Sequence, residues 1–331
     1  MKISLLDYGL LDEERTYQEA WQDSLALVQA ADRLGYHRFW LAEHHNVHAL
    51  TIGNPEVVIS YLASQTQRIH LGSGGIMGLH YSPYKIAELA ASLETLFPGR
   101  VDIGLGNSTG TALVKEHMRS QFQPSQFEQW VRQFTGYLTG KDEVIGLSPK
   151  LASYPEIFTL GMGGQSMALS AKEGLGYVFG SFPYIPHDPV ETAGKLAQDY
   201  RRDFQPSDIM AQPHFALALF VVVAETSQEA ENLAKSLDIW MLGKKNFNEF
   251  THFPSLATYQ AYDLTEQDRE RIAQHRSRMI IGNPAEVKEQ LERLVAACQP
   301  DELLFIPFVS GIDNRLKAIE LLAQIVESET L

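Results

Sequence analysis

The residue types best suited to catalysis form one short run, Glu43-His44-His45-Asn46. Because histidine titrates near neutral pH, a histidine at the mouth of a cavity can donate a hydrogen bond or exchange a proton with a ligand. Side chains alternate along a strand, so consecutive residues of this run cannot all bind one metal ion, and the H-E-x-x-H spacing is absent. We predict no metal site: one histidine faces a cavity, and the other has a structural role together with Glu43.

Three glycine-rich segments also follow apolar runs: Gly72-Ser73-Gly74-Gly75, Gly104-Leu105-Gly106-Asn107-Ser108 and Gly161-Met162-Gly163-Gly164-Gln165-Ser166. Glycine permits tight turns, and its bare backbone also lets a flat ring lie directly against the chain. A single segment favours the first interpretation, whereas three segments at one cavity favour the second. None has the spacing of a dinucleotide-binding fingerprint or a P-loop, so a dinucleotide fold is not expected.

The segment that ends at Ser166 is the candidate phosphate site. It leads from a predicted strand into a helix that is predicted to begin near Gln165. The free N–H groups and the positive dipole end of a helix start attract an anion. Ser166 either donates its hydroxyl to a phosphate oxygen or caps the helix, and the two roles are compatible.

The elements that must position these residues alternate between strands and helices. The predicted strands are 2–7, 38–43, 69–73, 101–105, 156–161, 177–180, 215–223 and 302–308, and the predicted helices are 17–34, 55–64, 83–96, 126–138, 166–173, 189–202 and 284–297. Such alternation implies a parallel sheet with right-handed crossovers. Eight strands favour an α/β fold of the TIM (β/α)8 type, with a late insertion between 223 and 302 and one domain over residues 1–331. Ligands then bind where the carboxyl ends of the strands meet.

The net charge and the cysteine content of the chain limit the classes of partner and compartment to be expected. The chain has 331 residues and a net charge of −14, from 27 Lys and Arg against 41 Asp and Glu. This charge disfavours nucleic acid and anionic membranes, and it requires that any bound phosphate be held by local donors. Cys298 is the single cysteine, which fits a reducing compartment. No stretch approaches the ~20 apolar residues that span a bilayer, so a cytoplasmic protein is expected.

Several motifs together resemble the luciferase-like flavin-dependent monooxygenases. They are Trp40-Leu41-Ala42-Glu43-His44-His45, Gly53-Asn54-Pro55, Leu71-Gly72-Ser73-Gly74-Gly75, Phe97-Pro98-Gly99-Arg100-Val101-Asp102-Ile103-Gly104-Leu105-Gly106 and Gly282-Asn283-Pro284, with the glycine-rich segment at 161–166. The matches keep their order over nearly the whole chain. The resemblance implies a TIM barrel that uses reduced FMN and O2 to oxidise a small organic substrate such as an aldehyde, with a separate reductase supplying the flavin.

The resemblance also implies roles for individual residues. His44 would act in catalysis close to the flavin, and a backbone turn at Ser73-Gly74, often a cis peptide in the family, would support the ring. The expected cofactor contacts are Asp7, His45, Ser73, Gly74, Gly75, Gly106, Asn107, Gly161, Met162, Gly163, Gly164 and Ser166. A homodimer formed through the helices beside the early strands is expected. The candidate lid is the region from the 240s to the 270s, which contains Lys244, Lys245, Asn246 and several aromatic residues.

The sequence departs from the family at three positions. Asn107 stands where many relatives have an arginine that pairs with the phosphate, Gly163 where a serine is common, and Gly106 where luciferase has a reactive cysteine. Loss of a charged donor costs ~1.5–3 kcal/mol, or one to two powers of ten in affinity. Two alternatives therefore stand beside the monooxygenase: a barrel reductase that uses the deazaflavin F420, and a flavin-binding accessory protein without catalysis.

Overall fold

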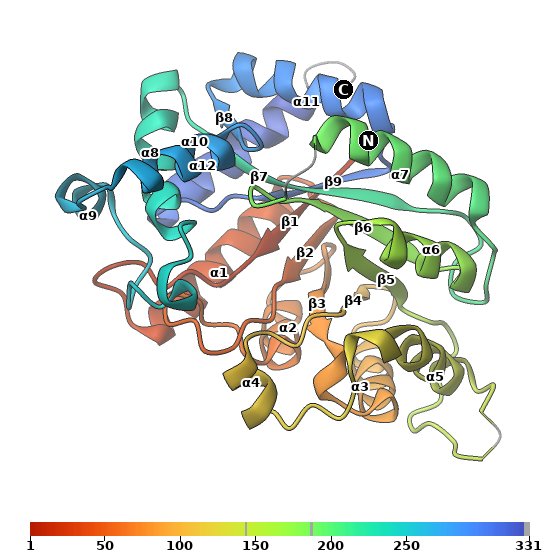
Figure 1. The fold of residues 1–331 in the computed structure, drawn as a ribbon. Coiled ribbons are helices and arrows are strands. Elements are labelled where there is room, and N and C mark those ends of the chain that lie inside the picture. The colour runs from red at the N-terminus through yellow and green to blue at the C-terminus, as the bar shows by residue number, and fades with distance from the viewer. Residues whose placement is uncertain (143, 186–187, 328–331) are drawn as a thin grey trace.

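The computed structural model describes residues 1–142, 144–185 and 188–327 (Figure 1). Eight parallel strands form a closed barrel: β1 (Lys2–Asp7), β2 (Arg38–Leu41), β3 (His70–Met77), β4 (Val101–Gly106), β5 (Glu156–Gly161), β6 (Gly176–Ser181), β7 (Phe215–Val223) and β9 (Glu302–Ile306). Strands β1 to β6 pair in order, β6 pairs with β7, and β9 closes the ring between β7 and β1. The predicted TIM barrel is confirmed.

Helices surround the barrel (Figure 1). They are α1 (Tyr17–Arg33), α2 (Pro55–Ser64), α3 (Pro83–Leu96), α4 (Ala112–His117), α5 (Phe127–Thr139), α6 (Gly164–Glu173), α7 (Pro189–Asp203), α11 (Pro284–Cys298) and α12 (Ile312–Glu327). Short 3-10 turns, η1 (Gly78–His80) and η2 (Pro124–Gln126), precede α3 and α5. A capping box between Thr16 and Glu19 starts α1, as residues of these types do at helix N-termini. None of the described helices is both long enough and apolar enough to cross a bilayer.

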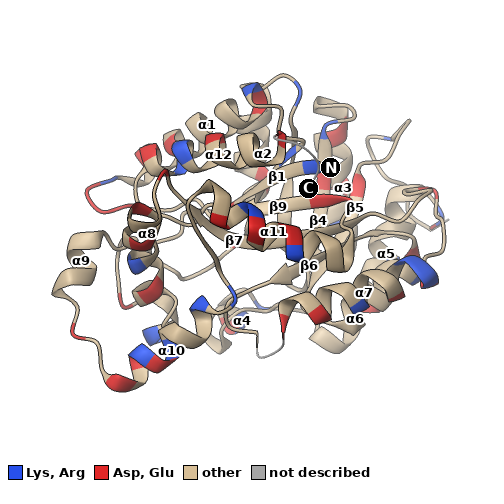
Figure 2. Cartoon of the chain, turned by 90° about the horizontal axis from the view of Figure 1, so that it is seen from above, with Lys and Arg blue, Asp and Glu red and all other residues tan. Residues whose placement is uncertain are grey.

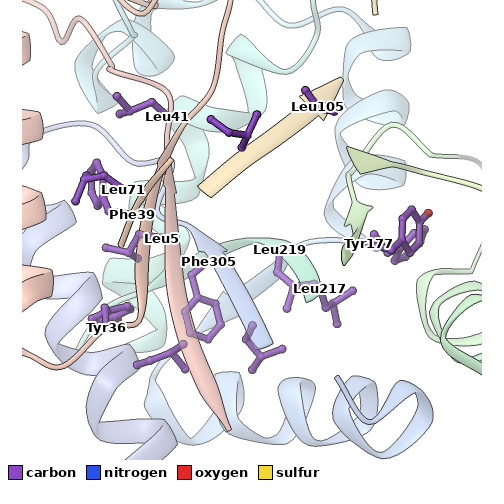
Figure 3. Packing of buried hydrophobic residues seen from close by; sticks show 14 of the residues in the cluster. Leu5, Tyr36, Phe39, Leu41, Leu71, Leu105, Tyr177, Leu217, Leu219 and Phe305 are labelled. Atoms are coloured by element: carbon purple, nitrogen blue, oxygen red, sulfur yellow. The ribbon is translucent and has the colours of Figure 1, made fainter. Parts of the chain in front are cut away.

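Alternation along the strands divides the core into two layers. In β1, Leu5 belongs to the layer between the strands and the outer helices, whereas Leu6 belongs to the layer inside the barrel. Figure 3 shows part of the outer layer, with Leu5, Phe39 and Phe305 from neighbouring strands among its members. Lys, Arg, Asp and Glu are spread over the helices and loops around the barrel (Figure 2). The apolar runs of the sequence therefore form the strands because both of their faces are buried.

The late insertion lies between β7 and β9, as predicted. It contains α8 (Ser227–Trp240), η3 (Lys244–Phe247), α9 (Leu256–Ala261), α10 (Glu266–Arg276) and a short strand, β8 (Ile280–Gly282), followed by α11. Strand β8 was not predicted from the sequence: it is three residues long and pairs with the carboxyl end of β7. Gly243, Asn246 and Phe247 reach the carboxyl end of the barrel, where they help to line a cavity.

The opposite end of the barrel is closed by a buried charge cluster. The Arg38 guanidinium lies 2.8 Å from Asp102, 2.8 Å from Glu156 and 2.9 Å from Glu302. Burial alone would raise the pKa of Glu302, but Arg38 and His214 outweigh it, so the pKa of this carboxyl lies well below its usual range. Because Arg38 and Glu302 are the first residues of β2 and β9, the cluster forms the amino-terminal floor of the barrel.

Candidate active site

A cavity of about 530 Å³ opens at the carboxyl ends of the barrel strands. Ligands bind at this end of (β/α)8 barrels, and the volume lies in the range of small-molecule sites. Residues of β1 and of β3 to β7, the loops that follow several strands including β2, and η3 contribute to the lining. The structure brings many of the predicted site residues together here, namely His44, His45, Gly74, Gly75, Gly106, Asn107, Gly161 and Met162.

Two other predicted cofactor contacts lie inside the protein framework instead. The Asp7 carboxylate accepts hydrogen bonds from the Gly9 amide at 3.0 Å and from the Ser24 hydroxyl at 2.5 Å. The Ser73 hydroxyl donates to the Gly104 carbonyl at 2.9 Å and accepts from the Gly104 amide at 3.1 Å. Neither side chain lines the cavity, so both hold the strand ends in position.

Strand β3 extends farther than the sequence predicts. It runs through Gly74 and Gly75 to Met77, with a register shift against β4 between Ser73 and Ile76. The cis peptide joins Gly74 to Gly75, one residue later than the expected position at Ser73-Gly74. A Cβ on Gly75 would lie 2.8 Å from the Gly104 carbonyl oxygen, so close approach of the strands requires glycine here. The two glycines therefore present bare backbone to the cavity from within a strand, and not from a loop.

His44 lines the cavity, and only one of its two ring nitrogens has a hydrogen-bond partner among the described residues. Its Nδ1 lies 3.3 Å from the Ala42 carbonyl oxygen, a contact that a protonated Nδ1 makes as a donor. The ring stacks on Tyr8 with centroids 4.9 Å apart. Burial lowers the pKa of His44 from 6.5 to about 4, so the imidazole is neutral at pH 7. Its Nε2 then carries a lone pair and can accept a proton or a hydrogen bond from a bound molecule.

Acid is expected to destabilise the fold through His44. Because the pKa of His44 is about 4 in the folded chain and 6.5 in the unfolded chain, the unfolded chain binds the proton first as the pH falls. The contribution is fully present above pH 6.5 and is lost as the pH falls to about 4, at a cost on the order of 2 kcal/mol. Urea unfolding at neutral pH and near pH 4.5 measures this loss, which we expect to be smaller in His44→Gln. Equal losses in the two proteins would contradict the assignment.

His45 also lines the cavity, whereas the sequence analysis predicts that only one of the two histidines does. Its Nε2 donates to Glu43 at 2.6 Å, and the same carboxylate accepts from the Tyr81 hydroxyl and the Met77 amide, each at 2.7 Å. Glu43 thus ties the loop after β2 to the end of β3 and has the predicted structural role. Among the described residues no group of three or more His, Cys, Asp or Glu side chains could hold a metal ion.

The start of α6 lies beside the cavity and has open backbone. Gly163 is the N-cap, in extended conformation and without a side-chain cap, so Ser166 is not the capping residue that the sequence analysis allowed. A Cβ on Gly163 or Gly164 would meet nothing within 4 Å. The amides of the first helical turn have no partner within the helix and are available to an anion. Gly163, Gly164 and Ser166 lie just outside the cavity lining, next to Met162.

Two buried hydroxyls hold this helix start in place. The Tyr177 hydroxyl donates to the carbonyls of Gly161 at 3.3 Å and Gly163 at 3.2 Å. The Thr159 hydroxyl donates to the Ser166 carbonyl at 3.2 Å. Neither role could be predicted from the sequence, because a tyrosine or threonine within a strand gives no sign of the loop that it will contact.

Comparison with known proteins decides the family. A family model described as luciferase-like monooxygenase matches residues 1–298. The chain belongs to the luciferase-like monooxygenase family. Two relatives from Bacillus subtilis (strain 168) match over almost their whole length. The uncharacterized protein YwcH is 34% identical, with 98% of each chain covered, and N-acetyl-S-alkylcysteine monooxygenase is 30% identical, with 96% of each chain covered.

The solved structure of apo-MsnO8 extends the similarity to three dimensions. It is 26% identical to this luciferase-like monooxygenase, the alignment covers 100% of this chain and 99% of that one, and the TM-score is 0.87. The family resemblance predicted from the motifs is therefore confirmed, together with the barrel.

The cavity of this luciferase-like monooxygenase has a side that the motifs do not indicate. Four aromatic side chains line it, from the segment after β1, the segment after β6 and η3: Tyr8, Phe182, Tyr184 and Phe247. None belongs to a recognisable motif. All four lie in loops or in the late insertion, so their meeting at one cavity depends on the tertiary fold.

Proposed function

We propose that this chain is an FMN-dependent monooxygenase that uses reduced FMN and O2 to oxidise a small organic substrate. The observation that carries the proposal is the arrangement around one cavity. A neutral His44 and the bare backbone of β3 lie at the cavity, and the uncapped start of α6 lies at its edge. The family membership supports a monooxygenase, and the geometry supports a flat, singly phosphorylated cofactor.

The residues present fit FMN without a cationic anchor. Bare backbone at Gly74, Gly75 and Gly106 leaves room for a flat ring, and Asn107 supplies a neutral polar side chain beside them. The phosphate would accept hydrogen bonds from the amides of Gly164 and the next residues of α6. The described lining contains no Lys or Arg, so amide hydrogens and the helix dipole must stabilise the phosphate.

In this proposal the cofactor, His44 and η3 have separate roles. When bound, reduced FMN supplies the electrons with which O2 is activated. The Nε2 atom of His44 accepts a proton or a hydrogen bond at the reacting centre, while the contact of Nδ1 with the Ala42 carbonyl fixes the ring orientation. Phe247 and its neighbours in η3 lie over the cavity and reduce the access of water.

Solved proteins of the same fold support the choice of cofactor and partner. The oxygenating constituent of 3,6-diketocamphane monooxygenase, 18% identical with a TM-score of 0.72, was solved in complex with FMN. Its description as one constituent of a larger system supports our proposal that a separate reductase delivers reduced FMN to this chain.

Gly164→Pro is expected to weaken FMN binding by about tenfold to a hundredfold, because it removes one amide donor to a charged phosphate. The helix should persist, since proline suits the first helical position and Gly163 already has extended backbone. Quenching of flavin fluorescence during titration measures the dissociation constant.

Glu266→Pro is the matched control, because Glu266 is the first residue of α10 and does not line the cavity. We expect it to leave FMN affinity unchanged, and we expect riboflavin, which has no phosphate, to bind both variants and the unaltered chain equally. An FMN affinity that Gly164→Pro does not change would contradict the phosphate site.

A further inference from the structure

The cavity has two chemically different sides. The side formed by β3, β4 and β5 presents glycine backbone, whereas the segments after β1 and β6 and η3 present Tyr8, Phe182, Tyr184 and Phe247. We call these four side chains the aromatic wall. The Phe182 and Tyr184 rings lie 5.7 Å apart. The flavin site proposed above uses the glycine side, so the aromatic wall is left for the second reactant.

A second row of buried rings supports the aromatic wall. Phe308 lies 5.0 Å from Tyr8, Phe220 lies 5.7 Å from Phe182, and Trp240 lies 4.7 Å from Phe247. Phe220, Phe308 and Trp240 are themselves in contact with other core rings and are buried. Ring pairs at these separations attract one another, so the wall has a defined shape before a ligand enters.

Outside the proposed phosphate site at the start of α6, the charges around the cavity disfavour an anionic ligand. Glu43 is the one carboxylate in the described lining, and three protein donors already occupy it. The two lysines of η3 supply no cation to the lining: Lys244 bonds to Asp268 at 2.9 Å, and Lys245 is exposed outside the cavity. An anion would have to be desolvated there without a positive partner, which is costly.

The Tyr8 hydroxyl is free to recognise an oxygen atom. Tyr8 lines the cavity, and no hydrogen-bond partner for its hydroxyl is present in the described part of the chain. Burial raises the pKa of Tyr8 well above its usual value, so the hydroxyl remains a donor at all physiological pH values. Its ring stacks on His44, which places this donor beside the proposed reacting centre.

We propose that the aromatic wall binds an uncharged aromatic substrate and that the Tyr8 hydroxyl donates a hydrogen bond to an oxygen atom of that substrate. The role of the ligand as substrate rests on the proposed function, whereas its binding does not. Tyr8 then selects for molecules with an acceptor near the aromatic group, and the rest of the wall selects for apolar surface without charge.

Calorimetric titration of the FMN-saturated protein with two matched probes tests the proposal. The probes are 2-acetonaphthone, which is neutral, and 6-acetyl-2-naphthoate, which adds a carboxylate. We expect the neutral ketone to bind more tightly by at least about tenfold. Tyr8→Phe should weaken binding of the ketone about twofold to tenfold and leave binding of 2-ethylnaphthalene, which has no acceptor, unchanged.

Charge reversal provides a second variant. Tyr184→Lys places a cation in the wall at a side chain that is 50% exposed and tolerates a polar substitute, and it should strengthen binding of the carboxylate probe several-fold. Leu96→Lys adds the same charge at an exposed position at the end of α3, near the opposite end of the barrel, and should have no effect.

The outcomes separate this proposal from the proposed function. Equal affinity for the two probes, or no binding of the neutral ketone to a protein that does bind FMN, would overturn the aromatic substrate site. If the protein binds the ketone but not FMN, the proposed function fails and the aromatic site stands. If Tyr8→Phe weakens the ketone and 2-ethylnaphthalene equally, the Tyr8 hydrogen bond is wrong.

Discussion

Replacing His44 with glutamine is expected to lower the rate of substrate oxidation by about 10²- to 10⁴-fold, the range of a general acid–base group. Glutamine keeps polarity and similar size, but it cannot accept a proton. The assay uses any substrate that the unaltered chain oxidises, found by screening for oxygen consumption with reduced FMN. FMN affinity should change little, because the proposed phosphate contacts lie at α6.

His48→Gln is the matched control, because His48 is an exposed histidine of the same loop and does not line the cavity. We expect it to leave turnover unchanged. The pH profile of activity distinguishes a catalytic from a structural role of His44. Because the pKa of His44 is lowered to about 4, activity should stay constant from pH 7 down to about pH 5 and fall nearer pH 4. A fall centred on pH 6.5, or normal turnover in His44→Gln, would remove His44 from the mechanism.

Arg38→Met is expected to reduce the free energy of unfolding by about 3–5 kcal/mol, which is among the largest effects of a single substitution. The substitution leaves Asp102 and Glu302, both at most 1% exposed, without their cation. Chemical denaturation at neutral pH measures the loss. The cavity lies at the other end of the barrel, so FMN affinity should persist below the unfolding transition.

Arg132→Met is the control for loss of an arginine charge. Arg132 pairs with Glu128 and Glu173 on the surface, where solvent screens ion pairs and they contribute little to stability. The two variants should therefore differ by several-fold in their effect on stability. If Arg38→Met lowers the free energy of unfolding by less than about 1 kcal/mol, water or rearranged side chains compensate the buried carboxylates, and the predicted role of Arg38 is wrong.

Long apolar runs made the barrel predictable. The bounds of β1, β5 and β7 agree with the sequence prediction; β7 is buried along its whole length, and β1 along all but its first residue. Strand β3 was predicted too short, since Gly74 and Gly75 are typical of turns and only their packing against β4 reveals them as strand residues. The short strand β8 gives too few residues for any periodic signal.

Site residues could be predicted where several of them lie next to one another in the sequence. The run at Glu43-His44-His45 and the glycine segments lie at the cavity edge because strand ends meet there. The neutral state of His44 depends on Tyr8 and on burial by distant elements, which no local pattern contains. In the same way, an arginine at the start of a strand is expected to be exposed, so nothing near Arg38 in the sequence indicates its burial. Its three carboxylate partners come from three other strands.

The most direct test of the account is a crystal structure of this chain with FMN bound. We predict that the ring lies in the cavity between His44 and the backbone of Gly74 and Gly75, with the phosphate within hydrogen-bond distance of the amides at the start of α6. Density for the ring outside the barrel mouth, or for a phosphate held elsewhere while the α6 amides bind only water, would contradict it.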